Sequence, residues 1–243
     1  MKDPLVVLPG FMADARAFLP QLVHLGTNRM VIVLLPTHGE SVEQITQAVL
    51  PLLPPQFGLL GHGLGGLVAI EILRRKPEAV TRLALIATDP LPEPPQAAAA
   101  REVQIIAAKS GKLADAMRHE IPLTALAETE WCDDVLALVQ DMAAGLGPDQ
   151  FQRQSRALQR RPDQQKTLRK LKVPALVIAG AADTIVPLRR AEFLAGLIPT
   201  ARLHIVPEAG HLPQLEQPEA VSEALTEFFA GPLMLRPETL LLR

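Results

Sequence analysis

Short apolar runs alternate with amphipathic stretches along most of the chain. Most of these runs are apolar at successive positions, which is typical of strands buried on both faces of a parallel sheet. They predict strands at residues 5–8, 31–35, 57–60, 83–87, 175–179 and 202–206. The stretches between them predict helices at 15–25, 42–53, 64–75, 188–197 and 218–229. The alternation predicts a doubly wound α/β fold with a mainly parallel six-stranded sheet and helices on both faces.

One interval breaks this alternation. Between Asp89 and Pro174 there is no good strand, but there are several helical segments rich in Ala, Leu, Gln and Arg. Because a structureless loop of this length is implausible, we predict a helical insertion over 90–170 and a core domain made of 1–89 and 171–243. An insertion after a strand's carboxyl end would overhang the crevice where open α/β sheets bind ligands, so we expect a lid. A helical layer with no role in access is the alternative.

Composition and charge narrow the class of protein. The 243 residues are 48% hydrophobic and 21% charged, enough for one large domain with a sizeable core. The 24 basic and 26 acidic residues are interspersed, so no one-sided positive field suits nucleic acid or an anionic membrane. The single cysteine, Cys132, excludes an internal disulfide framework. The first apolar run is too short for a signal peptide, and no run reaches the ~18–20 residues of a membrane span. We expect a cytoplasmic protein with neither nucleic-acid nor membrane partner.

A glycine-rich segment, Gly-His-Gly-Leu-Gly-Gly at 61–66, links the third predicted strand to a predicted helix. In a nucleophile elbow, Gly-x-nucleophile-x-Gly, the turn is so sharp that the flanking positions 61 and 65 must be glycine. The middle residue adopts a strained conformation and presents its side chain above the sheet. Hydrolases normally have Ser, Cys or Asp there, but this chain has Gly63, which carries no nucleophile.

The same segment matches the dinucleotide-binding pattern G-x-G-x-x-G through Gly61, Gly63 and Gly66, with Asp89 after the next strand. A lone match of this kind is a weak signal, and the pattern usually opens the first strand–helix–strand unit of its domain. Here two strands precede it. It also leaves the polar residues of the C-terminal third unexplained, so we favour the elbow.

Two polar residues follow the last two predicted strands. Asp183 comes after the strand at 175–179, and His211 after the strand at 202–206. With the segment at 61–66 they give the chain order nucleophile, acid, base. A hydroxyl is a poor nucleophile until a histidine takes its proton, and the carboxylate holds that imidazole in the right tautomer. Helix capping by Asp183 and a surface position for His211 are the ordinary alternatives.

These segments resemble the α/β-hydrolase fold superfamily, in particular its serine esterase-like branch. Leu-Pro-Gly-Phe-Met at 8–12 is similar to its oxyanion-hole loop, and Pro-Thr-His-Gly-Glu-Ser at 36–41 to its turn with a His-Gly pair. The glycine-rich segment resembles G-H-S-x-G-G with Gly63 in place of Ser, and Asp183 and His211 match the acid and base positions. The resemblance covers nearly the whole chain except 90–170, where sequences of this superfamily vary widely.

The resemblance implies hydrolysis of a carboxylic ester or a related small-molecule acyl substrate, without a cofactor or a metal. A serine at the position of Gly63 would be the nucleophile, His211 the base and Asp183 the orienting acid. Asp89 is the fallback acid, because some relatives place the carboxylate after that earlier strand.

Further residues are expected beside these groups. The backbone amides of Phe11 and Leu64 would stabilise an oxyanion. Met12 and His62 are expected at the substrate pocket, with core packing as the alternative for Met12 and a structural role as the alternative for His62. The chain has no Tyr, seven Phe and one Trp, and its insertion is aliphatic, so we expect an apolar pocket. The sequence carries no signal of oligomeric state.

Three explanations of Gly63 are open. In the first, it is an engineered Ser→Gly change that leaves an esterase nearly inactive. In the second, a natural enzyme uses His211 without covalent catalysis, as the base for a water molecule or in a lyase or cyclase reaction. In the third, the chain is a non-catalytic small-molecule binding protein. The intact Asp183 and glycine frame favour the first, because a redundant triad has no physical reason to persist.

Overall fold

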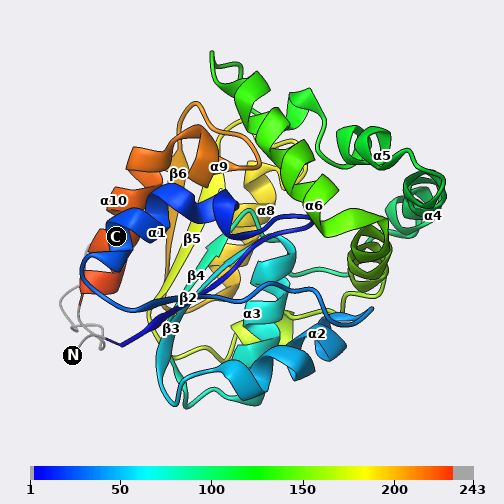
Figure 1. The fold of residues 1–243 in the computed structure, drawn as a ribbon. Coiled ribbons are helices and arrows are strands. Elements are labelled where there is room, and N and C mark those ends of the chain that lie inside the picture. Colours follow the sequence, from blue (N-terminus) through cyan, green and yellow to red (C-terminus); the bar gives the residue numbers. More distant parts are fainter. Residues whose placement is uncertain (1–2, 232–243) are drawn as a thin grey trace.

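A six-stranded parallel sheet forms the centre of the molecule (Figure 1). The computed structural model describes residues 3–231. Within them the strand order is β2-β1-β3-β4-β5-β6, and each neighbouring pair is parallel. The strands are β1 (Leu5–Leu8), β2 (Val31–Val33), β3 (Phe57–His62), β4 (Val80–Ile86), β5 (Ala175–Gly180) and β6 (Ala201–Val206). The predicted fold class is confirmed.

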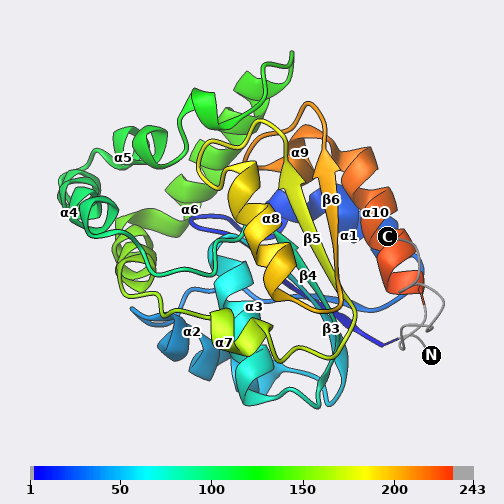
Figure 2. The same ribbon diagram turned by 180° about the vertical axis from the view of Figure 1, so that it is seen from behind.

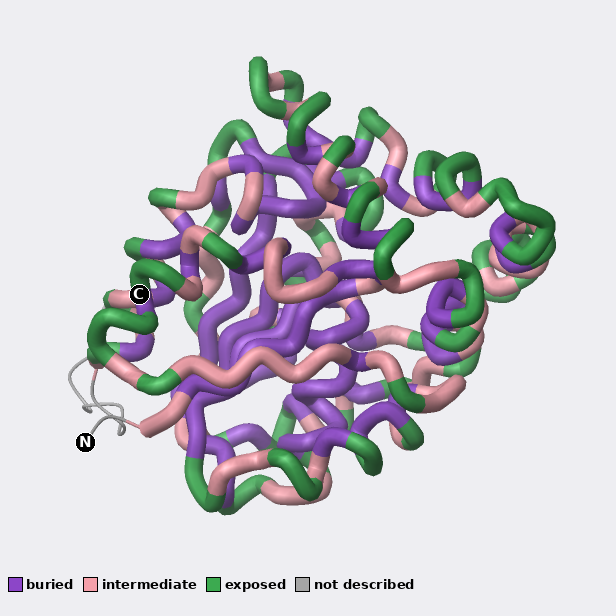
Figure 3. The backbone as a smooth tube through the Cα atoms, viewed as in Figure 1, coloured by how far each residue is buried: buried purple, intermediate pink, exposed green. Residues whose placement is uncertain are grey.

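The sheet separates two hydrophobic cores, one on each face, and the central strands contribute side chains to both. Leu5 and Val7 of β1 belong to one core, and Val6 and Leu8 belong to the other, because successive strand residues point to opposite faces. β1 and β3 are buried along their whole length, whereas β2 at the edge is partly buried (Figure 3). This two-sided burial explains why the central strands are apolar at successive positions of the sequence.

Helices cover both faces of the sheet (Figures 1 and 2). One face carries α1 (Leu19–Gly26) and α10 (Pro218–Ala230). The opposite face carries α2 (Val42–Val49), α3 (Leu64–Arg75) and α8 (Leu188–Leu197). Two of the predicted helices, 15–25 and 42–53, each consist of an α-helix and a short 3₁₀ turn, and one further four-residue helix was not predicted. The 3₁₀ turns are η1 (Ala15–Phe18) before α1 and η2 (Leu50–Leu52) after α2. The helix that was not predicted is α9 (Pro213–Glu216).

The interval between β4 and β5 is helical. Its first helices lie beyond the carboxyl ends of the strands, whereas its last short helix packs beside α3 (Figures 1 and 2). It consists of α4 (Pro95–Lys109), α5 (Leu113–Glu120), η3 (Leu123–Ala125), α6 (Cys132–Gln159) and α7 (Gln165–Leu168). α6 is kinked at Gly147, whose φ is 80° and ψ 170°, and Pro148 follows directly. Among the described residues, no helix has both the length and the apolar character needed to cross a membrane.

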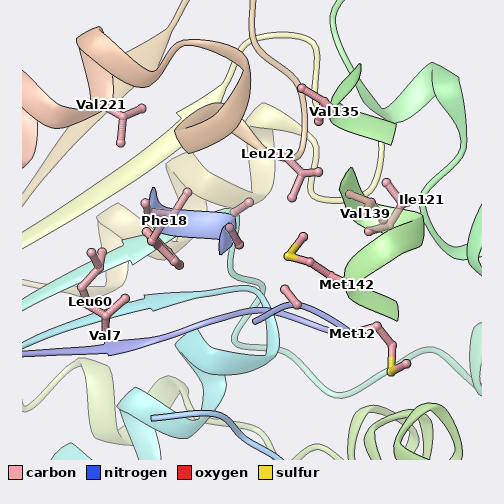
Figure 4. Close-up of a cluster of buried hydrophobic side chains, with 14 of the residues drawn as sticks. Val7, Met12, Phe18, Leu60, Ile121, Val135, Val139, Met142, Leu212 and Val221 are labelled. Carbon is pink, nitrogen blue, oxygen red and sulfur yellow. The ribbon is translucent and has the colours of Figure 1, made fainter. Parts of the chain in front are cut away.

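The helical interval shares a core with the sheet. Figure 4 shows Val139 and Met142 of α6 in the same hydrophobic cluster as Phe18 and Leu212, which lie outside the interval. Removing these helices would expose apolar side chains on both sides of the contact, so the two parts stabilise each other.

Candidate active site

The turn from β3 to α3 requires glycine at two positions for steric reasons. A Cβ at Gly61 would lie 2.6 Å from the carbonyl oxygen of Gly65, and a Cβ at Gly65 would lie 2.0 Å from the carbonyl oxygen of Leu8. At Gly63 the nearest atom to an added Cβ would be the carbonyl oxygen of Ala87, 4.0 Å away. The backbone at Gly63 has φ 49° and ψ −114°, a conformation that strains other residues. Position 63 therefore has room for a side chain at a cost in backbone strain.

Gly65→Ala should lower the free energy of unfolding by about 3 kcal/mol or more, since its Cβ would press on fixed backbone at Leu8. Gly196→Ala in α8 is the matched control: its Cβ meets no atom within 4 Å, and Ala is favoured over Gly inside a helix. Chemical unfolding should give a large loss for the first variant and no loss for the second. Equal stabilities would contradict the close approach of this turn to the loop after β1.

A carboxylate and an imidazole meet beyond the ends of β5 and β6. Asp183 Oδ2 lies 2.9 Å from His211 Nδ1, and the two side chains are 1% and 10% exposed. Asp183 Oδ1 accepts the backbone N–H groups of Ile185 at 2.8 Å and Val186 at 2.9 Å. Because an ionised carboxylate only accepts hydrogen bonds, Nδ1 of His211 donates, and Nε2 is left for other chemistry.

Asp89, the fallback acid, has other partners. Its Oδ1 accepts the backbone N–H of Leu91 at 3.1 Å, and its Oδ2 lies 3.7 Å from the guanidinium of Arg161. The structure thus pairs His211 with Asp183.

The backbone amides predicted to stabilise an oxyanion lie at the pocket that contains Gly63. Phe11 and Leu64 both line this pocket. Leu64 is the first residue of α3, where a helix leaves its N–H groups without intrahelical partners. Within residues 3–231 neither amide donates a hydrogen bond. Both amides are thus free to bind an acceptor.

Of the two residues predicted at the pocket, His62 lies there and Met12 does not. Met12 is fully buried in the hydrophobic core, and its backbone N–H donates to Gln154 Oε1 at 2.7 Å (Figure 4). The prediction for Met12 is therefore corrected to core packing, the alternative reading. Its positive φ of 49° turns the chain inward directly after Phe11, which carries the side chain of Met12 into the core.

One small pocket joins these groups. It is lined by Gly63, Leu64, Phe11, His62 and His211, and its volume is about 80 Å³. The remaining lining residues come largely from the helical interval and the segment after β4, and include both apolar and charged side chains. The charged ones are Asp89, Arg101, Glu120 and Arg161. The pocket thus has the expected apolar lining together with a charged part that the sequence analysis did not predict.

Comparison with known proteins decides the family. Residues 5–224 match the sequence model of the alpha/beta hydrolase family. The chain belongs to this family. A pimeloyl-[acyl-carrier protein] methyl ester esterase of Aromatoleum aromaticum is 32% identical over 81% of this chain and 83% of that protein. One of Edwardsiella ictaluri is 30% identical over 95% and 94% of the two chains. The enol-lactonase of Burkholderia xenovorans superimposes with a TM-score of 0.83 at 23% identity, covering 95% and 93%, which shows the common fold.

A buried carboxylate that the sequence analysis missed fixes the histidine loop of this alpha/beta hydrolase. Glu216 of α9 accepts the backbone N–H groups of Gly210 at 2.8 Å, Leu212 at 2.9 Å and Ala127 at 2.7 Å. The N–H of His211 itself donates to the carbonyl oxygen of Ala125 at 2.7 Å. Burial raises the pKa of Glu216, and the three amide hydrogen bonds oppose this shift. Glu216 thereby ties both flanks of His211 to the loop after η3.

His62 supports the same loop from the other side. Its Nε2 lies 3.0 Å from the carbonyl oxygen of His211, and the two rings are 5.2 Å apart. Burial, followed by the nearby His211, lowers the pKa of His62 from 6.5 to about 3. A neutral His62 therefore donates its Nε2–H to the backbone of His211, so it has the structural role as well as a place at the pocket.

The depressed pKa of His62 predicts a loss of stability in acid. Unfolding releases the histidine to its ordinary pKa, so the unfolded chain binds a proton that the folded chain excludes between pH 6.5 and about 3. Between pH 7.5 and 4.5 this group alone should remove about 2–3 kcal/mol of unfolding free energy. Urea unfolding of the unmodified chain and of His62→Gln at both pH values should show a smaller loss in the variant. His24→Gln, which removes an exposed histidine, is the control; an equal acid loss in all three proteins would contradict a neutral, buried His62.

Proposed function

We propose that this alpha/beta hydrolase has the site of a carboxylic ester hydrolase acting on a small-molecule acyl substrate, and that Gly63 leaves it without a nucleophile. The proposal is supported by one pocket that both Gly63 and His211 line, where His211 Nδ1 is hydrogen-bonded to Asp183. The identity to curated esterases over most of both chains supports the same reaction class.

Each group has a role in the proposed reaction. A serine hydroxyl at position 63 would attack the ester carbonyl while Nε2 of His211 takes its proton. The developing oxyanion would accept hydrogen bonds from the amides of Phe11 and Leu64. Asp183 would hold the imidazole in the tautomer that leaves Nε2 free and stabilise its cation. With glycine at position 63 the first step has no attacking group, so the chain should be nearly inactive toward esters.

We further propose that residues 90–170 act as a lid. Arg101 of α4, Glu120 of α5 and Leu158 of α6 line the pocket, so a ligand at Gly63 would lie against the helical interval. Movement of these helices would change access to the site.

A panel of carboxylic esters and thioesters, assayed with the unmodified chain and with Gly63→Ser, tests the proposed function. Turnover that is feeble in the first protein and substantial in the second supports it. A Gly63→Ser variant that is inert on the whole panel contradicts the esterase proposal. Turnover by the unmodified chain that His211→Gln abolishes would instead identify His211 as the base for a water molecule or for a lyase reaction.

A further inference from the structure

A group of charged side chains near Gly63 and His211 has no role in the chemistry described above. Asp89, Arg101, Glu120 and Arg161 line the pocket, and Glu93 lies behind them in contact with both arginines. All five side chains are between 4% and 16% exposed. Burial of charge is costly unless the group is paired or binds a ligand, so the hydrogen bonds of each group show which of them has capacity left.

Arg101 is held beside the pocket by three hydrogen bonds. Glu93 accepts from its Nε at 2.8 Å and its Nη2 at 3.0 Å, and Glu120 accepts from its Nη1 at 2.6 Å. Its guanidinium also lies over the ring of Phe11, 5.7 Å from the centroid. Burial opposes the charge, but Glu120 and Glu93 outweigh it and raise the pKa of Arg101. Arg101 is therefore a fixed, charged part of the pocket.

Arg161, in contrast, has no side-chain hydrogen bond to the residues that the structure describes. Its terminal nitrogens lie 3.7 Å from Asp89 Oδ2 and 4.0 Å from Glu93 Oε1, distances too long for hydrogen bonds. Its Nε is buried and has no hydrogen-bond partner within residues 3–231. Burial, the largest effect on this group, lowers the pKa of Arg161. A planar guanidinium with five donors thus borders the pocket with its hydrogen-bonding capacity unused.

The charges of the five side chains that form this charged wall, Asp89, Glu93, Arg101, Glu120 and Arg161, limit what Arg161 can bind. Three carboxylates face two guanidinium groups, and Arg190 of α8, which also acts on Arg161 through space, does not line the pocket. The wall therefore has no excess of positive charge for an anionic ligand. Asp89 Oδ1 accepts from Leu91, whereas Asp89 Oδ2 forms only the long ion pair with Arg161. The wall thus offers both a donor and an acceptor.

We propose that Arg161 and Asp89 bind an uncharged carboxamide at the far end of the substrate's acyl chain. The amide oxygen would accept from Arg161, and the amide N–H would donate to Asp89 Oδ2, so no net charge enters the wall. A methyl group at this end would leave both polar groups unpaired, and a carboxylate would add a fourth negative charge beside Asp89. The inference rests on the proposed function for the ester bond, but the binding step needs no nucleophile.

Binding of product-like acids to the unmodified chain tests this subsite without catalysis. Hexanoate, adipate and adipamate share an acid end and differ at the other end, which is methyl, carboxylate or carboxamide. Titration calorimetry should show adipamate binding roughly 10- to 100-fold more tightly than hexanoate, the effect of hydrogen bonds to charged groups, and more tightly than adipate. Equal binding of hexanoate and adipamate, tighter binding of adipate, or binding of none of the three overturns the proposal.

Three variants assign the preference to the named residues. Arg161→Gln should abolish the preference for adipamate over hexanoate, and Arg161→Lys, which keeps the charge but not the planar fork, should weaken it. Asp89→Asn should shift the preference toward adipate, because a negative charge leaves the wall. Arg160→Gln is the control, since the neighbouring Arg160 side chain is 59% exposed. Thermal melting checks that each variant is folded; an adipamate preference that survives in folded Arg161→Gln overturns the proposal.

The methyl esters of the same three acids separate this inference from the proposed function. In the Gly63→Ser background, kcat/KM should follow the binding preference. If no ester turns over while the unmodified chain still prefers adipamate, the subsite stands and the esterase proposal fails. If all three esters turn over equally, the esterase proposal stands and the subsite fails.

Discussion

Gly63→Ser is expected to raise turnover of short activated carboxylic esters by several orders of magnitude. In another triad enzyme, loss of the serine costs about 10⁶ in kcat and leaves roughly 10³–10⁴ over water from binding and the oxyanion hole. The space around position 63 accepts a Cβ, and the glycines at 61 and 65 already hold the sharp turn. The only structural change required is the added side chain. Steady-state rates on a p-nitrophenyl ester measure the gain.

The control for this variant is Gly63→Ala. Both substitutions place a side chain at a φ of 49°, so both should lower the unfolding free energy by about 1–3 kcal/mol. Only the serine carries a hydroxyl, so only the serine variant should gain turnover. A similar gain with alanine would show that the rate comes from altered packing and would contradict nucleophilic attack by residue 63.

Asp183→Asn in the Gly63→Ser background should reduce kcat by about 10⁴, the effect of the same change in a serine protease. The structure gives the reason. Oδ1 of Asp183 is held by the N–H groups of Ile185 and Val186, so the new amide nitrogen would face Nδ1 of His211. Nδ1 would then have to accept a hydrogen bond from the amide. In that tautomer Nε2 already carries a proton, so it cannot take the proton of the serine hydroxyl.

His211→Gln in the same background should give a loss of similar size, since it removes the base itself. Asp89→Asn is the matched control for the acid, because Asp89 lies at the pocket but does not contact His211. On an activated acetate ester, Asp89→Asn should reduce kcat by less than Asp183→Asn does, because Asp89 does not hold the imidazole of His211. A larger loss with Asp89→Asn than with Asp183→Asn would reverse the assignment of the acid.

The sequence was sufficient for the fold because the four central strands are buried on both faces. Runs such as Leu5–Leu8 are apolar at every position. This local pattern indicates a parallel sheet even when the contacts between distant segments are unknown. Asp183 and His211 were found for a related reason: in a parallel sheet, the residues after successive strands meet at one edge. The glycines at 61 and 65 were found because a close approach of backbone admits no other residue.

The parts that the sequence did not predict depend on contacts between segments far apart in the chain. Met12 follows Phe11 directly, and only the backbone turn decides which of the two side chains faces the pocket. Glu216 belongs to a four-residue helix, and its three amide partners include Ala127, 89 residues away. The charged wall brings Asp89 and Arg161 together across the whole helical interval. No local pattern encodes these pairings.

The structure also changes one argument about Gly63. The presence of Asp183 and of the glycines at 61 and 65 would favour an engineered Ser→Gly change only if these residues had no other purpose. Asp183 holds the loop that begins α8 by accepting two backbone amides, and glycine is sterically required at 61 and 65. These residues would therefore persist in a natural protein without a nucleophile, so an engineered origin gains no support from them.

Covalent labelling with a fluorophosphonate tests the central claim most directly, because the reagent reports an activated hydroxyl beside an oxyanion site. After incubation, mass spectrometry of the Gly63→Ser protein should show one phosphonyl group on the peptide that contains residue 63. The unmodified chain and the Gly63→Ser, His211→Gln double variant should stay unlabelled. A folded Gly63→Ser protein that takes up no label, or takes it up equally without His211, would contradict the placement of position 63 against an active His211–Asp183 pair.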